Sequence, residues 1–178
     1  MGREVRMVPK AWEHPRNEDG NFIPLCKGSY ATRAAEWDFA REQWGKGLQE
    51  DWAGGWKARD GNALTIARYT DWAGPRPSPD DYMPEWPEEV ATHLMMYEDT
   101  SEGTPISPAF ATPEELARWL ADNNASAFAN DTATYEQWLS TCKRGWAVSA
   151  VMVAGGPMTS GVAGMDAFGS AKRDERAA

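Results

Sequence analysis

Four hydroxyl-bearing residues and a glycine lie close together in the segment TSEGTPISP, residues 100–108. Small residues allow successive backbone N–H groups to point into one concavity, which can hold an anion. The hydroxyls add further hydrogen-bond donors, and Gly103 permits close approach to the backbone. The segment also leads toward a helix expected to begin at Pro113, whose N-terminal dipole favours negative charge. The pattern predicts a ligand-binding loop.

The candidate binding residues extend to both sides of this loop. Tyr97 is suited to stack on a ring, and Arg118 is the nearest cation in sequence that could meet an anion. The full set of ligand-binding candidates is Tyr97, Thr100, Ser101, Gly103, Thr104, Ser107 and Arg118. The alternative is a tight loop whose hydroxyls satisfy its own backbone. Glu98, Asp99 and Glu102 also argue against a highly charged phosphate in the loop.

Other site chemistries find little support in the sequence. The two histidines, His14 and His93, and the two cysteines, Cys26 and Cys142, have no zinc-ligand spacing, so neither a metal nor a cofactor is expected. Neither histidine is paired with a nucleophile, so no catalytic residue is assigned. The phosphate-binding motifs GxxxxGK[ST] and GxGxxG are absent. We expect both cysteines to be reduced packing residues.

Tryptophan is abundant, with ten residues in a chain of 178. They stand at positions 12, 37, 44, 52, 56, 72, 86, 119, 138 and 146. Most are interpreted as core residues, and Trp119 and Trp138 share helical stripes with leucines. One or two are expected to be exposed as stacking surfaces. Because so much apolar surface exceeds one small core, we predict a homodimer or a higher homo-oligomer.

The N-terminal half alternates between one long element and irregular segments. Residues 2–9 alternate polar and apolar side chains and predict a short edge strand that ends at Pro9. Residues 30–49 carry apolar side chains at helical spacing and predict an amphipathic helix. A short helix is expected over residues 64–72. Five prolines in residues 74–87 then predict an irregular wrap.

The C-terminal half is expected to mix strands and helices. In chain order these are a strand over 93–98, an irregular strand over 105–110, a helix after Thr112, a helix over 133–143 and strands over 148–153 and 158–162. Thr112 is the predicted N-cap, with Pro113 at the first helical position and Glu115 two residues further on. The order predicts an α+β fold: a small antiparallel sheet with helices packed on one face, plus an N-terminal helix and the Pro-rich wrap.

One compact unit is expected, with internal parts at residues 1–90 and 91–169 and a flexible tail at 170–178. The formal net charge of −9 predicts repulsion from nucleic-acid backbones and anionic membranes, so no direct nucleic-acid or membrane partner is expected. No apolar run approaches the roughly 20 residues that span a bilayer. The first ten residues lack the apolar region of a secretory signal, which favours a cytoplasmic location.

Five segments of the chain resemble an uncharacterised family of accessory proteins from tailed bacteriophages. They are REVRMVPKAWEHP (3–15), DDYMPEWPEE (80–89), MYEDTSEGTPISPAFATPEELARWLADNNASAF (96–128), TATYEQWL (132–139) and GWAVSAVMVAGGPMTSGV (145–162). The resembling segments are spread over residues 3–162 of the chain, and the segment YEDTSEGTPISPAFATPEELARWL is the most specific of them. It implies a phage accessory gene acting in the cytoplasm of the infected bacterial host. It brings no established activity and no catalytic residues.

Several functions fit these features. The leading hypothesis is a protein that counters host immunity by binding and sequestering a small nucleotide-derived signalling molecule. The alternatives are an acidic inhibitor directed at a host nucleic-acid or defence enzyme, and an enzyme that degrades a nucleotide signal. A small virion component ranks last, because the sequence shows neither a coiled coil nor a repeat.

Overall fold

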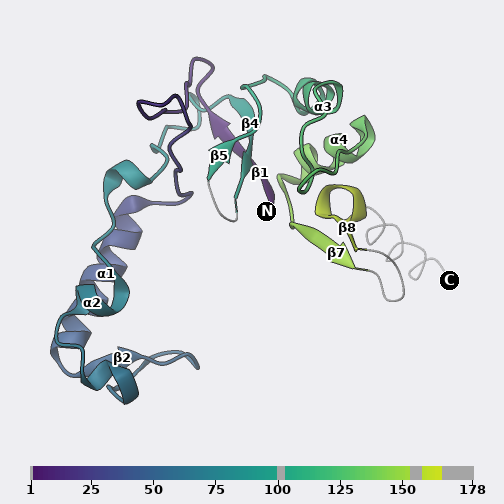
Figure 1. The fold of residues 1–178 in the computed structure, drawn as a ribbon. Coiled ribbons are helices and arrows are strands. Elements are labelled where there is room, and N and C mark those ends of the chain that lie inside the picture. The colour runs from purple at the N-terminus through teal and green to yellow at the C-terminus, as the bar shows by residue number, and fades with distance from the viewer. Residues whose placement is uncertain (1, 100–102, 153–157, 166–178) are drawn as a thin grey trace. The chain divides into compact units, whose positions relative to one another are not determined.

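The computed structural model describes residues 2–99, 103–152 and 158–165. Within these residues the chain folds into short helices and several small antiparallel sheets, which is an α+β fold as the sequence predicts (Figure 1). It divides into two compact units, residues 26–85 and the remainder of the chain. No helix among the described residues is long and apolar enough to cross a bilayer.

The larger unit, residues 1–25 with 86–178, contains a four-stranded antiparallel sheet of order β5-β4-β1-β6. Its strands are β1 (Arg3–Val8), β4 (His93–Glu98), β5 (Thr104–Pro105) and β6 (Trp146–Ala147). β1 pairs with β4 along its whole length, from Arg3 opposite Glu98 to Val8 opposite His93. The sequence predicts that β1 and β4 lie in different parts of the chain, residues 1–90 and 91–169. In the structure the two strands pair and belong to the same unit.

The prediction that β1 is an edge strand is wrong. β1 lies between β4 and β6, because its first two residues also pair with Trp146 and Ala147. Pro9, which suggested an edge, follows the last residue of the strand. Its missing N–H therefore falls outside the ladder and leaves the pairing intact.

One face of this sheet packs against two helices, α3 (Pro113–Asp122) and α4 (Tyr135–Arg144), which lie against each other (Figure 1). Met96 of β4 joins Leu116, Leu120 and Trp138 in the main hydrophobic cluster, and all four side chains are fully buried. The N-cap prediction is confirmed, since Thr112 Oγ1 accepts a hydrogen bond from the Glu115 N–H at 3.2 Å. A separate two-stranded sheet pairs β7 (Ala150–Met152) with β8 (Met158–Ser160).

The opposite face of the sheet carries Glu4, Arg6, Met95 and Tyr97, which alternate with the helix-facing residues along β1 and β4. Arg6 is buried, donates to Glu4 and to the carbonyl oxygen of Leu25, and stacks 4.4 Å from the centre of the Tyr97 ring. The loop that follows β1 covers this polar face instead of a helix. The loop and the sheet together position the candidate site.

The smaller unit, residues 26–85, has its own aromatic core. Its elements are α1 (Tyr30–Gly45), β2 (Leu48–Glu50), β3 (Trp56–Ala58), the 3-10 turns Gly61–Leu64 and Pro79–Asp81, and α2 (Tyr69–Ala73). Trp44 of α1 is buried. Its ring packs against Tyr69 and stacks on Trp72, and these contacts join α1 to α2.

The helix predicted over residues 64–72 does not form as one element. Residues 65–68 separate the 3-10 turn from α2. The Arg59 guanidinium donates to the Ile66 carbonyl oxygen at 3.1 Å, and Trp44 Nε1 donates to that of Ala67 at 3.3 Å. Two carbonyl groups that a continuous helix would use internally are therefore bonded to side chains instead.

Candidate functional site

The structure gives the predicted loop residues different surroundings. Thr100 and Ser101 lie outside the described residues. Thr104 is partly buried and pairs with Glu98 as the first residue of β5. Arg118 lies on the exposed face of α3, with its guanidinium 3.8 Å from the centre of the Tyr135 ring. Thr104 and Arg118 thus lie on separate elements, β5 and α3.

Gly103 and Ser107 are occupied by contacts within the protein. Gly103 has a φ of +55°, and a Cβ at this position would overlap the carbonyl group of Leu25. The Leu25 N–H donates a hydrogen bond to the Gly103 carbonyl oxygen at 3.2 Å. Ser107 is buried, and its Oγ accepts from the Met96 N–H at 2.9 Å while donating to the Pro108 carbonyl oxygen at 2.8 Å. At these two positions the loop bonds to backbone groups of Leu25, Met96 and Pro108, which favours a structural role over ligand binding.

Tyr97 is fully buried on the polar face of the sheet, so its ring has no free face for a ligand to stack on. Its hydroxyl instead joins three side chains. It accepts from Trp12 Nε1–H at 3.2 Å and lies 3.2 Å from His14 Nδ1 and 3.4 Å from Met95 Sδ. The hydroxyl of Tyr97 thus fixes the loop after β1 to the floor of the sheet.

The hydrogen bonds determine which nitrogen of His14 carries the proton. His14 Nε2 lies 2.6 Å from the carbonyl oxygen of Ile23, which can only accept, so Nε2 donates and Nδ1 of the neutral ring accepts from Tyr97. Burial lowers the pKa of His14 below its ordinary value, with the nearby Arg6 and Arg16 acting in the same direction. Burial also raises the pKa of Tyr97, which keeps its hydroxyl protonated.

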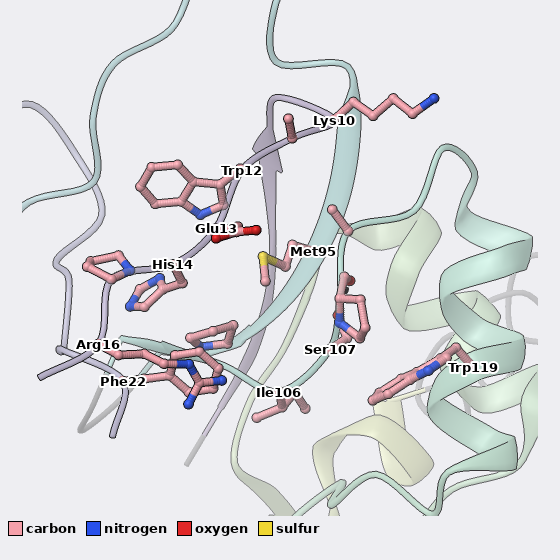
Figure 2. A pocket seen from close by; sticks show the side chains of 15 residues that line it. Lys10, Trp12, Glu13, His14, Arg16, Phe22, Met95, Ile106, Ser107 and Trp119 are labelled. Atoms are coloured by element: carbon pink, nitrogen blue, oxygen red, sulfur yellow. Dashed lines mark hydrogen bonds between the residues drawn. The ribbon is translucent and has the colours of Figure 1, made fainter. Parts of the chain in front are cut away.

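A groove of about 990 Å³ opens beside this network (Figure 2). We call it the first groove. Residues 10–16 form one wall and residues 105–109 the other, while Phe22, Met95 and Trp119 complete the lining. All of these residues belong to the larger unit. The first groove therefore lies at the β5 edge of the sheet, next to the loop in which the sequence placed the site.

Turns shape the wall that carries Trp12 and His14. The Trp12 N–H donates to the Pro9 carbonyl oxygen at 3.0 Å, which reverses the chain directly after β1. Asn17 Oδ1 accepts from the N–H groups of Asp19 and Asn21, and this turn brings Phe22 back opposite Arg16. The Ile23 N–H donates to the Pro15 carbonyl oxygen, so residues 15–23 form a small closed hairpin.

Two cations on this wall have no acidic partner among the described residues. Lys10 makes no ion pair there, and Arg16 stacks on the Phe22 ring at 3.6 Å from its centre and donates to the Gly20 carbonyl oxygen. Glu13 is the one acidic residue among the described residues of the lining. With His14 neutral, the described residues of the lining carry a net charge of +1 in a chain whose formal net charge is −9.

Aromatic surface lines the first groove on both sides. Trp12 is partly buried and packs edge-on against Trp86, with ring centres 4.8 Å apart, and Trp119 of α3 is partly buried across the groove. Figure 2 shows the Trp119 ring beside the 105–109 wall and the stacked Arg16 and Phe22 on the opposite wall. The combination of partly exposed rings and unpaired cations suits a ligand that has both a ring and an anion.

Sequence reasoning identified the rings but not the groove. The sequence presents Trp12 as one of ten tryptophans and His14 as one of two histidines, and no local pattern links either residue to Tyr97. The available signal was the density of Lys, Trp, His and Arg in KAWEHPR, residues 10–16, within an acidic chain. Trp119 was predicted to be a core residue, and it does pack against the main cluster, but it also lines the first groove.

No protein-family model, curated protein or solved structure matches this chain. Within the described residues, no three His, Cys, Asp or Glu side chains come together to hold a metal ion. Both cysteines are free thiols, and burial raises the pKa of Cys142 to about 12.

Proposed function

We propose that this protein binds and sequesters a small nucleotide-derived molecule in the first groove. The observation that carries the proposal is the lining of that groove, where partly exposed tryptophan rings flank cations that lack an acidic partner among the described residues. A base or another flat ring would stack on Trp12 or Trp119. A phosphate would meet Lys10 and the stacked guanidinium of Arg16, whose planar fork suits bidentate binding of an anion.

Binding without turnover is favoured by the state of His14. Both of its ring nitrogens are engaged, one by Tyr97 and the other by the Ile23 carbonyl oxygen. A general base needs a free nitrogen within reach of a substrate proton, and the lowered pKa of His14 also weakens it as an acid-base group near neutral pH. This arrangement supports a holding role for the groove.

The biological setting of the proposal comes from the resemblance to phage accessory proteins. Such a protein acts in the cytoplasm of the infected bacterium. There, removal of a nucleotide-derived signal from solution would counter a host immune response. The acidic chain suits this role, because it avoids non-specific attachment to nucleic acid while the positive groove remains selective for a small anion.

The test is a depletion and recovery assay with a panel of mononucleotides, cyclic nucleotides and ADP-ribose derivatives. The protein is incubated with each compound, filtered to measure depletion, then denatured to measure recovery. We expect at least one compound to be depleted and recovered intact. A converted product would contradict sequestration, and absence of depletion across the panel would contradict binding of this ligand class.

A matched pair of variants ties binding to the first groove. Arg16→Ala removes a groove cation and should weaken binding by about tenfold or more, the loss typical of a charged hydrogen bond. Arg68→Ala makes the same change of charge at an exposed residue of the smaller unit, where Arg68 forms an ion pair with Asp71. Equal affinities of the two variants would show that the ligand does not use the first groove.

A further inference from the structure

A second groove of about 820 Å³ adjoins the first and shares Lys10, Ala109 and Trp119 with it. It runs along the exposed side of α3 to Tyr135. Each groove by itself falls within the roughly 300–1,000 Å³ of pockets that hold drug-sized ligands. A mononucleotide in the first groove would leave the second empty, although the two are continuous at Lys10 and Trp119.

The chemistry of the second groove differs from that of the first. Glu115 and Asp122 line it without an ion pair among the described residues, whereas Glu114 is neutralised by Lys143 at 2.8 Å. These carboxylates would repel a phosphate and would accept hydrogen bonds from the amino group of a base. The Arg118 guanidinium carbon lies 3.8 Å from the centre of the Tyr135 ring, and the planar guanidinium is a group on which a ring can stack.

We propose that the two grooves hold the two ring systems of one ligand of the dinucleotide class, with its anionic linker at Lys10. This inference rests on the proposed function and names its ligand more closely. One ring lies in the first groove near Trp12 and Phe22. The second ring lies in the second groove, beside Arg118 and within reach of Glu115 or Asp122. Lys10 and Trp119 line both grooves, so Lys10 meets the linker and Trp119 separates the two rings.

Calorimetric titration with AMP and with the linear dinucleotide ApA, and with GMP and GpG, tests the inference. At least one dinucleotide should bind about tenfold or more tightly than its mononucleotide, because the second ring binds as a tethered group. Arg118→Ala should reduce dinucleotide affinity to about the mononucleotide level and leave mononucleotide affinity unchanged. Glu115→Gln, a milder change at an exposed residue of the same groove, should also weaken only the dinucleotide.

The outcomes separate this inference from the proposed function. Equal affinities for the mononucleotides and their dinucleotides would overturn the two-groove ligand and leave binding in the first groove standing. An Arg118→Ala variant that weakens both ligand types equally, or neither, would also overturn it. If neither ligand type binds, the two-groove inference fails, and the depletion panel alone then decides the proposed function. Arg68→Ala serves as the charge-matched control, and circular dichroism checks that each variant is folded.

Discussion

Tyr97 links the floor of the first groove to the wall that carries Trp12 and His14. Its hydroxyl forms hydrogen bonds with both Trp12 Nε1 and His14 Nδ1. The Tyr97 side chain is fully buried. Arg6 stacks on the same ring from β1. A single buried oxygen therefore determines the position of residues that the proposed ligand would meet.

Replacing Tyr97 with Phe should lower the free energy of unfolding by about 1–3 kcal/mol, because Trp12 Nε1 and His14 Nδ1 both lose their partner. Urea denaturation measures the loss. Tyr135→Phe is the control in the same unit, since no hydrogen bond from its hydroxyl to a described residue is observed. Equal losses in the two variants would contradict a structural role for the Tyr97 hydroxyl.

The buried His14 predicts a pH dependence of stability. The pKa of His14 in the folded protein lies below the ordinary value of 6.5. As the pH falls, His14 is therefore protonated in the unfolded chain before it is protonated in the folded chain. The contribution of His14 is fully present above pH 6.5 and is lost as the pH falls toward the folded pKa. Urea denaturation gives the free energies of unfolding of the wild type and of His14→Gln between pH about 7.5 and about 5. The advantage of the wild type over the variant should become smaller as the pH falls. A constant difference would contradict the prediction.

At the scale of elements, the hairpin of β4 and β5 depends on the contact between Gly103 and Leu25. Gly103→Ala introduces both an unfavourable φ and an overlap with the Leu25 carbonyl group. Gly20→Ala is the matched control, because Gly20 also has a positive φ, +84°, but has open space around it. The control should cost about 1–2 kcal/mol, and Gly103→Ala about 1–3 kcal/mol more. Thermal and urea denaturation of the two variants give the comparison, and equal costs would show that the overlap relaxes freely.

Helices α3 and α4 carry two tryptophans with different roles. Trp138 is fully buried in the main cluster, so Trp138→Ala should destabilise by about 3–5 kcal/mol. Trp119 is only partly buried and lines both grooves, so Trp119→Ala should cost less stability and weaken nucleotide binding. Denaturation and calorimetric titration of both variants separate the roles. A Trp119→Ala variant that loses as much stability as Trp138→Ala, with unchanged binding, would contradict this division.

At the scale of the whole molecule, the chain exposes apolar surface that no described residue covers. Trp52 is 95% exposed in the turn between β2 and β3, and Leu64 is 66% exposed in the same unit. We therefore still expect a homodimer or a higher homo-oligomer. Light scattering at micromolar concentration should give at least twice the mass of the chain. A monomeric mass would contradict this prediction.

The sequence by itself determined the elements whose signals are local. The Thr112 cap, the helical stripe of Leu116 and Leu120, and the alternation in residues 3–8 each reflect contacts within a few neighbouring residues. Such patterns give the α+β class and place most helices and strands. They also predict Trp138 to be a core residue, because it lies on the apolar face of its helix together with leucine.

Only the tertiary structure decided where these elements meet. The pairing of β1 with β4 joins residues about ninety positions apart, and this pairing brings Tyr97 beneath Trp12 and His14. No local pattern reports that distance in sequence. The same long-range packing buried Tyr97 and closed Gly103 against Leu25, and it formed the candidate groove, one wall of which is the end of the predicted loop. Burial depends on which segments meet across the fold, and residue types alone do not encode it.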